Sequence, residues 1–168
     1  MASDCYFVIT DFRLKGSDTL RFSFSATKAC NVLGCYTDND AQTNYSMYAT
    51  TTSGGKYIRY NGGTANSYIV ANERYDMVIT PTGATGLPTV STWTQKDFDC
   101  VSDFCVGTTS PSATSAKLSG TLYGDVIVDG RLHLVPVKRD SDDVIGYYDL
   151  ENDTFYEPTT GTPTPYVE

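Results

Sequence analysis

Residues 132–158 read LHLVPVKRDSDDVIGYYDLENDTFYEP, and this stretch has the clearest structural pattern in the chain. Three short apolar or aromatic runs are separated by the polar segments RDSDD and LENDT, which predicts three strands joined by two turns. Alternation places two sets of side chains on opposite faces of the middle strand: Val144, Gly146 and Tyr148 on one face, and Ile145, Tyr147 and Asp149 on the other. Because Asp149 stands beside a turn, we expect its carboxylate to accept backbone N–H groups rather than to catalyse a reaction.

The same two-residue period runs through most of the chain. In the segment TLRFSFSA, Leu20, Phe22 and Phe24 alternate with Arg21, Ser23 and Ser25. Further strands are expected at 5–14, 31–37, 45–51, 56–61, 67–72, 74–81, 89–94, 103–107 and, with a hairpin at Asp129 and Gly130, 117–137. About a dozen short strands without an amphipathic helix predict an all-β sandwich or barrel.

Length and linker signals predict one domain. The chain has 168 residues, which is enough for one hydrophobic core, and it shows no repeat of fixed period. Residues 1–158 are expected to form that domain. The Pro- and Thr-rich segment 159–168 is expected to be a tail, because proline pairs poorly within a sheet.

The charge balance argues against nucleic acid as a partner. The net charge is −8 and the basic residues are scattered, so no positive field is available for nucleic acid.

The sequence also lacks the apolar segments of membrane and exported proteins. No segment approaches the roughly 18 consecutive apolar residues of a membrane span. The N-terminal sequence MASDCYFVIT lacks the basic start and apolar run of a signal peptide, so assembly in a cytoplasm is expected.

The five cysteines occur at 5, 30, 35, 100 and 105. Two pairs have the spacing C-x4-C, so a four-thiolate zinc site at Cys30, Cys35, Cys100 and Cys105 is one alternative. The residues between them resemble strand sequence rather than metal knuckles. Buried free thiols that act as small hydrophobic side chains are therefore the favoured interpretation.

The C-terminal third resembles a known family. Six features follow one another along this part of the sequence: a D-G turn, a strand with L-x-P, a polar turn, G-Y-Y-D-L, a second polar turn and F-Y. The residues concerned are Asp129, Gly130, Leu134, Pro136, Gly146, Tyr147, Tyr148, Asp149, Leu150, Phe155 and Tyr156. This order resembles the concanavalin A-like (LamG-type) jelly-roll modules of phage and prophage proteins from gut bacteria. The resemblance implies a jelly-roll sandwich of two antiparallel sheets.

Catalytic patterns are weak, so we expect the chain not to be an enzyme. Glycosidases on this fold use paired carboxylates on one strand, and none of the four glutamates stands in such a pattern. The single histidine, His133, alternates with Leu132 and Leu134 and is expected on the outer face of its strand. No G-x-S-x-G elbow and no phosphate-binding glycine loop is present.

A calcium site is a second metal site that the sequence suggests. The loop DNDAQTN offers oxygen ligands from Asp38, Asp40 and Asn44, which is the ligand type that hard cations prefer. The loop lacks the glycine and glutamate positions of an EF-hand. A solvated turn without a metal is the alternative.

Aromatic residues are abundant, with 13 Tyr, 7 Phe and 1 Trp. Sugar sites combine flat aromatic faces with amide and carboxylate groups, because a pyranose has an apolar face and a polar edge. One region offers both kinds of group, and its candidate ligand-binding residues are Asn44, Tyr45, Tyr57, Arg59, Tyr60 and Asn61. Tyr45 and Tyr48 should face opposite sides of a strand. Half-buried strand positions, or a protein interface, are the alternative roles for these tyrosines.

The expected function is that of a non-catalytic bacteriophage virion surface protein. Displayed on the capsid or the tail, as a decoration or head-fibre protein, it would adhere to carbohydrate on the host surface. The alternative is a purely structural capsid decoration or minor tail protein that contacts neighbouring virion subunits. Its expected partners are other virion proteins and host glycans, without nucleic acid or membrane insertion. The sequence leaves open whether the chain forms a homo-oligomer.

Overall fold

A computed structural model of the chain describes residues 5–36, 45–49, 58–60, 63–65, 69–89, 91–111 and 116–163. Residues 58–60 and 63–65 are described by their backbone alone. In these ranges the regular structure consists of strands, and every strand pair is antiparallel. No described segment forms a helix long and apolar enough to cross a membrane.

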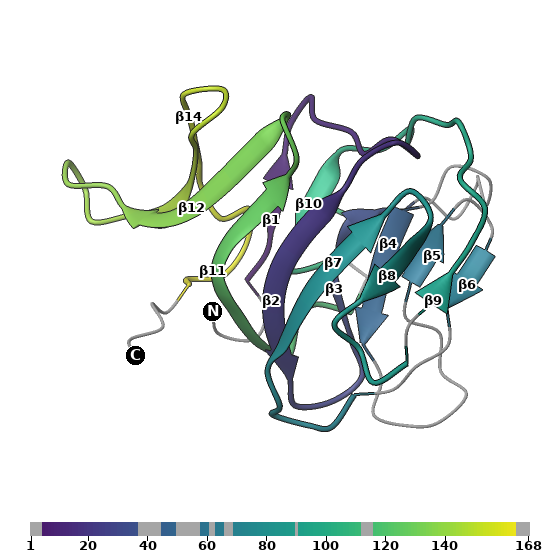
Figure 1. Cartoon of the computed structure of the whole chain (residues 1–168). Coiled ribbons are helices and arrows are strands. Elements are labelled where there is room, and N and C mark those ends of the chain that lie inside the picture. The colour runs from purple at the N-terminus through teal and green to yellow at the C-terminus, as the bar shows by residue number, and fades with distance from the viewer. Residues whose placement is uncertain are drawn as a thin grey trace.

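Two sheets face each other across a common core (Figure 1). Within the described residues, the smaller sheet has six strands in the order β1-β10-β3-β4-β5-β6. Their bounds are β1 Phe7–Ile9, β3 Cys30–Cys35, β4 Tyr45–Ala49, β5 Ile58–Tyr60, β6 Gly63–Ala65 and β10 Phe104–Val106.

The larger sheet has eight strands in the part of the chain that the structure describes, in the order β14-β13-β12-β11-β2-β7-β8-β9. Their bounds are β2 Leu20–Ala26, β7 Tyr75–Thr80, β8 Gly83–Thr85, β9 Ser91–Thr92, β11 Gly120–Val128, β12 Leu132–Lys138, β13 Ile145–Asp149 and β14 Thr154–Tyr156. The expectation of an all-β sandwich of two antiparallel sheets is thereby confirmed.

The alternating patterns decide which face of each strand meets the core. Leu20, Phe22 and Phe24 of β2 are buried, and the Phe24 ring packs against that of Tyr75 in β7. At the other end of the large sheet, Tyr147 of β13 meets Phe7 of β1 edge-on, with ring centroids 4.9 Å apart. Aromatic side chains thus connect the two sheets, as expected when each sheet has one apolar face.

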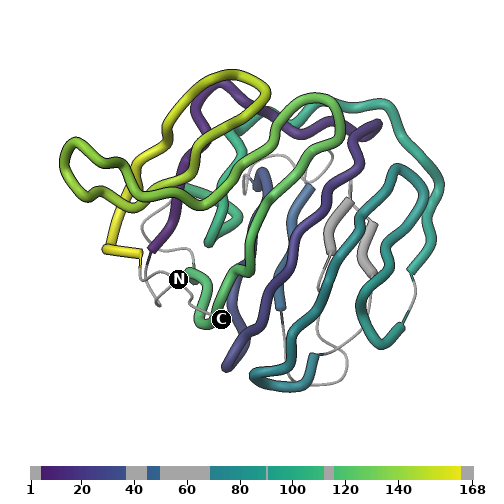
Figure 2. The backbone as a smooth tube through the Cα atoms, turned by 60° about the vertical axis from the view of Figure 1, so that its left-hand side comes forward, coloured from purple at the N-terminus to yellow at the C-terminus, as the bar shows by residue number. Residues whose placement is uncertain are grey.

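The closing stretch forms the predicted meander of three strands. Tyr147 and Asp149 are fully buried on one face of β13, as the alternation requires. The Asp149 carboxylate accepts the backbone N–H groups of His133 and Glu151, each at 3.0 Å, which confirms its expected role. The β12–β13 hairpin projects beyond the body of the sandwich (Figure 2).

Several segments differ from expectation. The expected strand 5–14 is a strand only over Phe7–Ile9, and residues 10–14 form a turn and a loop. Residues 69–72 form a loop and turn instead of the end of a strand, and Asn72 adopts a φ of 67° there. The start of the expected tail lies against β1. Thr159 donates its N–H to the Tyr6 carbonyl at 2.8 Å, and Thr160 forms an antiparallel bridge with Tyr6. These threonines precede Pro163, so the proline restriction on pairing does not reach them.

The cysteines are buried free thiols, as favoured from the sequence. Burial raises the pKa of the Cys35 thiol well above its usual value, and a hydrogen bond with Cys100 adds to the effect. Burial also raises the pKa of Cys105 to about 12. Within the described ranges, no group of three or more His, Cys, Asp or Glu side chains is arranged to hold a metal ion.

Candidate functional site

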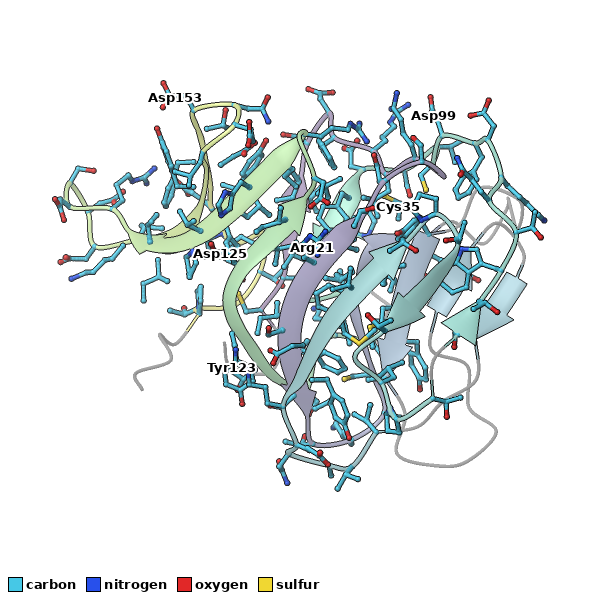
Figure 3. The ribbon with its side chains drawn as sticks, in the orientation of Figure 1. Arg21, Cys35, Asp99, Tyr123, Asp125 and Asp153 are labelled. Carbon is cyan, nitrogen blue, oxygen red and sulfur yellow. The ribbon has the colours of Figure 1, made fainter. Side chains whose placement is uncertain are left out.

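A groove of about 510 Å³ lies on the outer face of the large sheet, over β11, β2 and β7. Its polar lining comes from Arg21, Ser23, Arg74, Asp76, Tyr123 and Asp125. Arg21, Tyr123 and Asp125 mark its course along β2 and β11 (Figure 3). The sequence places these groups outward by the same alternation that sends Phe22 and Phe24 into the core.

An irregularity in β11 makes room for the groove. Between Tyr123 and Ile127 the pairing of β11 with β2 shifts in register, so residues 124–126 have no regular partner in β2. Gly124 adopts a φ of 63° in this bulge, a left-handed conformation that glycine adopts without a steric penalty. A Cβ at this position would meet no atom within 4 Å, which shows how open the backbone is here.

One wall of the groove is a network centred on Asp76. Ser23 donates its hydroxyl to Asp76 at 2.5 Å, and Arg74 donates its Nε–H to the same oxygen at 3.0 Å. Both hydrogen bonds lower the pKa of Asp76, and the one from Ser23 has the larger effect. The Arg74 guanidinium also lies 4.9 Å from the centre of the Tyr123 ring, and the Tyr123 hydroxyl is 3.1 Å from Ser25 Oγ.

Asp125 is the second carboxylate of the groove, and it pairs with a histidine that is not itself a lining residue. His133 of β12 faces outward, as its alternation with two buried leucines predicted, and its Nε2 lies 2.8 Å from Asp125 Oδ2. Nearer the β11–β12 turn, Arg21 binds Asp129 through two parallel hydrogen bonds of 3.0 Å. Among the described side chains, Ser23 is bound to Asp76 and not to His133, so the groove has no Ser–His pair of the kind that activates a nucleophile.

The groove therefore combines carboxylates, guanidinium groups and a tyrosine with the half-buried apolar side chains of Val78 and Ile127. Carboxylates accept hydrogen bonds from hydroxyls, and guanidinium groups donate to ring and hydroxyl oxygens. The apolar side chains offer contact to the C–H face of a sugar ring. Such a surface suits a ligand with many hydroxyl groups.

The tyrosine-rich region expected to bind a ligand is only partly described. Tyr45 is buried in the core with 1% of its surface exposed, and its hydroxyl donates to the Asp18 carbonyl at 3.5 Å. Tyr45 is therefore a core residue, which corrects the expectation that it meets a ligand. Tyr48 is on the opposite face and partly exposed, as predicted. Arg59 and Tyr60 lie in β5, where the structure describes the backbone alone.

The other candidate positions lie outside the described residues: Asp38, Asp40, Asn44, Tyr57 and Asn61. The calcium site expected at Asp38, Asp40 and Asn44 thus stays a prediction. Sequence analysis missed Arg74, Asp76, Tyr123 and Asp125, although the alternation in YDMVIT and GTLYGDVIV places the last three outward. It could not show that β11 lies beside β2 and β2 beside β7.

In comparisons with known proteins, no protein-family model, no curated protein and no solved structure matches the chain.

Proposed function

We propose that the chain is a non-catalytic binding module on the surface of a bacteriophage particle, and that it adheres to host carbohydrate through the outer-face groove. In this proposal the sandwich is a concanavalin A-like jelly roll, in line with the resemblance of residues 129–156. The particle assembles in the host cytoplasm and displays the module on its capsid or tail.

One observation carries the binding role. The groove brings Asp76 and Asp125 together with two guanidinium groups, Tyr123 and an apolar floor, on an open face of a rigid sheet. A pyranose needs acceptors and donors for its hydroxyls and an apolar contact for its ring face, and this lining supplies all of them. Sites on sheet strands also hold their side chains more rigidly than sites on loops.

The ionisation state of Asp76 suits the binding role. Hydrogen bonds from Ser23 and Arg74 lower the pKa of Asp76, so it stays an ionised acceptor at neutral pH. Ionised Asp76 fits the role of a hydrogen-bond acceptor for sugar hydroxyls.

A glycan array with the purified chain tests the proposal. We expect binding to neutral glycans, and a loss of about tenfold in affinity for Asp125→Asn and for Tyr123→Ala, as for a contact worth about 1.4 kcal/mol. Asp140→Asn is the matched control, because Asp140 is an exposed residue of the projecting hairpin and lies outside the groove. Its affinity should equal that of the unchanged chain.

Two outcomes would contradict the proposal. Binding no higher than background on every glycan, together with saturation of phage particles at fixed stoichiometry, would favour a structural decoration protein. Release of reducing sugar from a bound glycan, abolished by Asp76→Asn or Asp125→Asn, would show a hydrolase instead of a binding module.

A further inference from the structure

A second cleft lies at one end of the sandwich, among the loop that follows β1 and the turns that follow β11 and β13. It consists of two cavities of about 320 and 450 Å³ that share Asp11 and Arg131 as lining residues. Asp99 lines the first cavity and lies at the upper end of the molecule in Figure 3, far from Tyr123 at the lower end of the groove. The end cleft shares no lining residue with the outer-face groove.

Arg131 stands between the two cavities and is held on three sides. Its Nη1 donates to the buried carboxylate of Asp18 at 2.5 Å, and its Nη2 donates to the Arg13 carbonyl at 3.0 Å. The guanidinium also lies 4.7 Å from the centre of the Phe12 ring. Asp18 is fixed in turn, because it accepts the backbone N–H of Lys15 at 2.7 Å.

A guanidinium has five N–H groups in a planar fork, and the described residues accept hydrogen bonds from only two of those on Arg131. About a third of the side chain is exposed. An arginine that is anchored by its protein partners loses little conformational entropy when its other N–H groups bind an oxyanion. Arg131 is therefore preorganised to bind a carboxylate.

Two further cationic side chains, Arg13 and Lys15, line the first cavity, and their ion pairs are long. Arg13 Nε lies 3.8 Å from Asp103, and Lys15 Nζ lies 3.8 Å from Asp99, which is longer than a hydrogen bond. Both cationic side chains are about half exposed. A ligand carboxylate can replace these distant, solvated partners at small cost, because exposed ion pairs contribute little.

The second cavity offers groups that suit hydroxyls and a ring. This cavity is lined by Thr10, Asp11, Asn152 and Tyr156, together with Phe12. Burial, followed by the nearby charges of Asp149 and Asp11, raises the pKa of the Tyr156 phenol, so its hydroxyl remains a donor. Asn152 is fixed by hydrogen bonds from its Nδ2 to the Arg131 carbonyl at 3.1 Å and to Asp149 at 2.5 Å.

We propose that the end cleft is a separate binding site for an acidic sugar. The sugar carboxylate binds Arg131, Arg13 and Lys15 in the first cavity, and its hydroxyls meet Thr10, Asp11 and Tyr156 in the adjoining one. Asp11 accepts a sugar hydroxyl and so discriminates against a ligand that carries a second anionic group there. This site does not depend on the outer-face groove, and it binds whether or not the groove holds a neutral glycan.

Calorimetric titration of the full chain with trigalacturonic acid and with its neutral methyl ester tests the site. We expect binding of the acid, and at least tenfold weaker binding of the ester, because the ester loses the charge-assisted hydrogen bonds of the carboxylate. The double variant Arg13→Gln/Lys15→Gln should lose about tenfold in affinity for the acid. It keeps the Arg13 carbonyl and the Lys15 N–H that position Arg131 and Asp18.

The double variant Lys138→Gln/Arg139→Gln is the matched control, since it removes the same charge from the projecting hairpin. It should bind the acid as the unchanged chain does. Tyr156→Phe, which removes only a hydroxyl, should weaken binding of the acid about threefold, as for a neutral hydrogen bond. Circular dichroism melting of each variant separates lost binding from lost folding.

Three results would overturn the proposal: equal affinity for acid and ester, equal loss in both double variants, or full competition by free acetate. The third would show a simple anion site without a sugar. The groove variants Tyr123→Ala and Asp125→Asn distinguish this test from that of the proposed function. They should leave trigalacturonic acid binding unchanged, while the Arg13→Gln/Lys15→Gln variant should leave neutral-glycan binding unchanged.

Discussion

The two turns of the closing meander look alike in sequence but are stabilised in different ways. In the first turn, Arg139 binds Asp142 at 2.9 and 2.5 Å and Glu157 at 2.6 Å. A further ion pair joins Lys138 and Asp143 at 2.6 Å. All of these side chains are at least one third exposed, so water competes for each contact.

The second turn is built around one buried carboxylate. Asp149 is 0% exposed and accepts hydrogen bonds from two backbone N–H groups and from Asn152. The Asp149 carboxylate is shielded from solvent, so water competes little for these hydrogen bonds. We therefore expect the second turn to stabilise the fold more than the first, although the first turn has more charged contacts.

Asp149→Ala should have the largest effect. It removes a fully buried carboxylate that accepts three hydrogen bonds, so we expect the free energy of unfolding to fall by about 3 kcal/mol. Urea unfolding followed by circular dichroism measures this. The folded fraction should keep the glycan binding that we propose for the outer-face groove. Selective loss of binding at unchanged stability would contradict the structural role of Asp149.

Gly146→Ala tests how tightly the strands on either side of the second turn pack. A Cβ at position 146 would lie 2.5 Å from the Tyr156 carbonyl oxygen and 2.5 Å from the Phe155 ring. Because the backbone of β14 would have to shift, we expect a loss of about 2 kcal/mol in unfolding free energy. In Gly130→Ala, a control, the Cβ meets no atom within 4 Å. That variant should lose only about 1 kcal/mol, from its left-handed φ of 68°.

Asn152→Ala removes one donor of the Asp149 network but leaves the two backbone donors in place. We expect a loss of about 1 kcal/mol. Combined with Asp149→Ala, it should add less than it costs alone, because the hydrogen bond between Asn152 and Asp149 is already lost and only the one to the Arg131 carbonyl remains. A double variant whose loss equals the sum of the two single losses would show that Asn152 acts independently of Asp149.

Arg139→Gln should have the smallest effect, because its ion pairs are exposed. Its hydrogen bonds to Asp142 lower the pKa of that carboxyl group. Stability from a lowered carboxyl pKa is present above the pKa of the unfolded chain, about 4, and is lost as the pH falls through the folded value. The small decrease in melting temperature should therefore disappear in acid and in high salt. A decrease that persists at pH 2 would show a packing role for Arg139, whose guanidinium lies 4.6 Å from the centre of the Phe155 ring.

The alternation of apolar and polar side chains, with a period of two residues, predicted much of the fold. They gave the meander, the D-G hairpin and the outward position of His133, because alternation follows directly from the geometry of one strand. They also placed Arg21 and Ser23 outward. The sequence could not predict the groove, which depends on the pairing of β2 with β7 and β11 and on the bulge at Gly124.

The tyrosines show the limit of composition as evidence. Tyr45 belongs to a tyrosine-rich segment that suggested a sugar site, yet it fills the core. Tyr123 stands alone in its strand and lines the groove. Tyrosine suits both half-buried strands and binding surfaces, so its identity did not decide its role. The end cleft was missed for a different reason, since Asp11, Arg131 and Tyr156 are far apart in the sequence.

The pairing of Thr159 and Thr160 with Tyr6 determines how the fold would respond to mechanical force. The pair is antiparallel, so the chain before Tyr6 and the chain after Thr160 leave from the same end of the pair. Traction applied to both chain ends would thus peel these hydrogen bonds apart one at a time, instead of shearing them together. A module held at both ends would first release this short segment and expose the edge of β1, while the strands of the large sheet still bear no load.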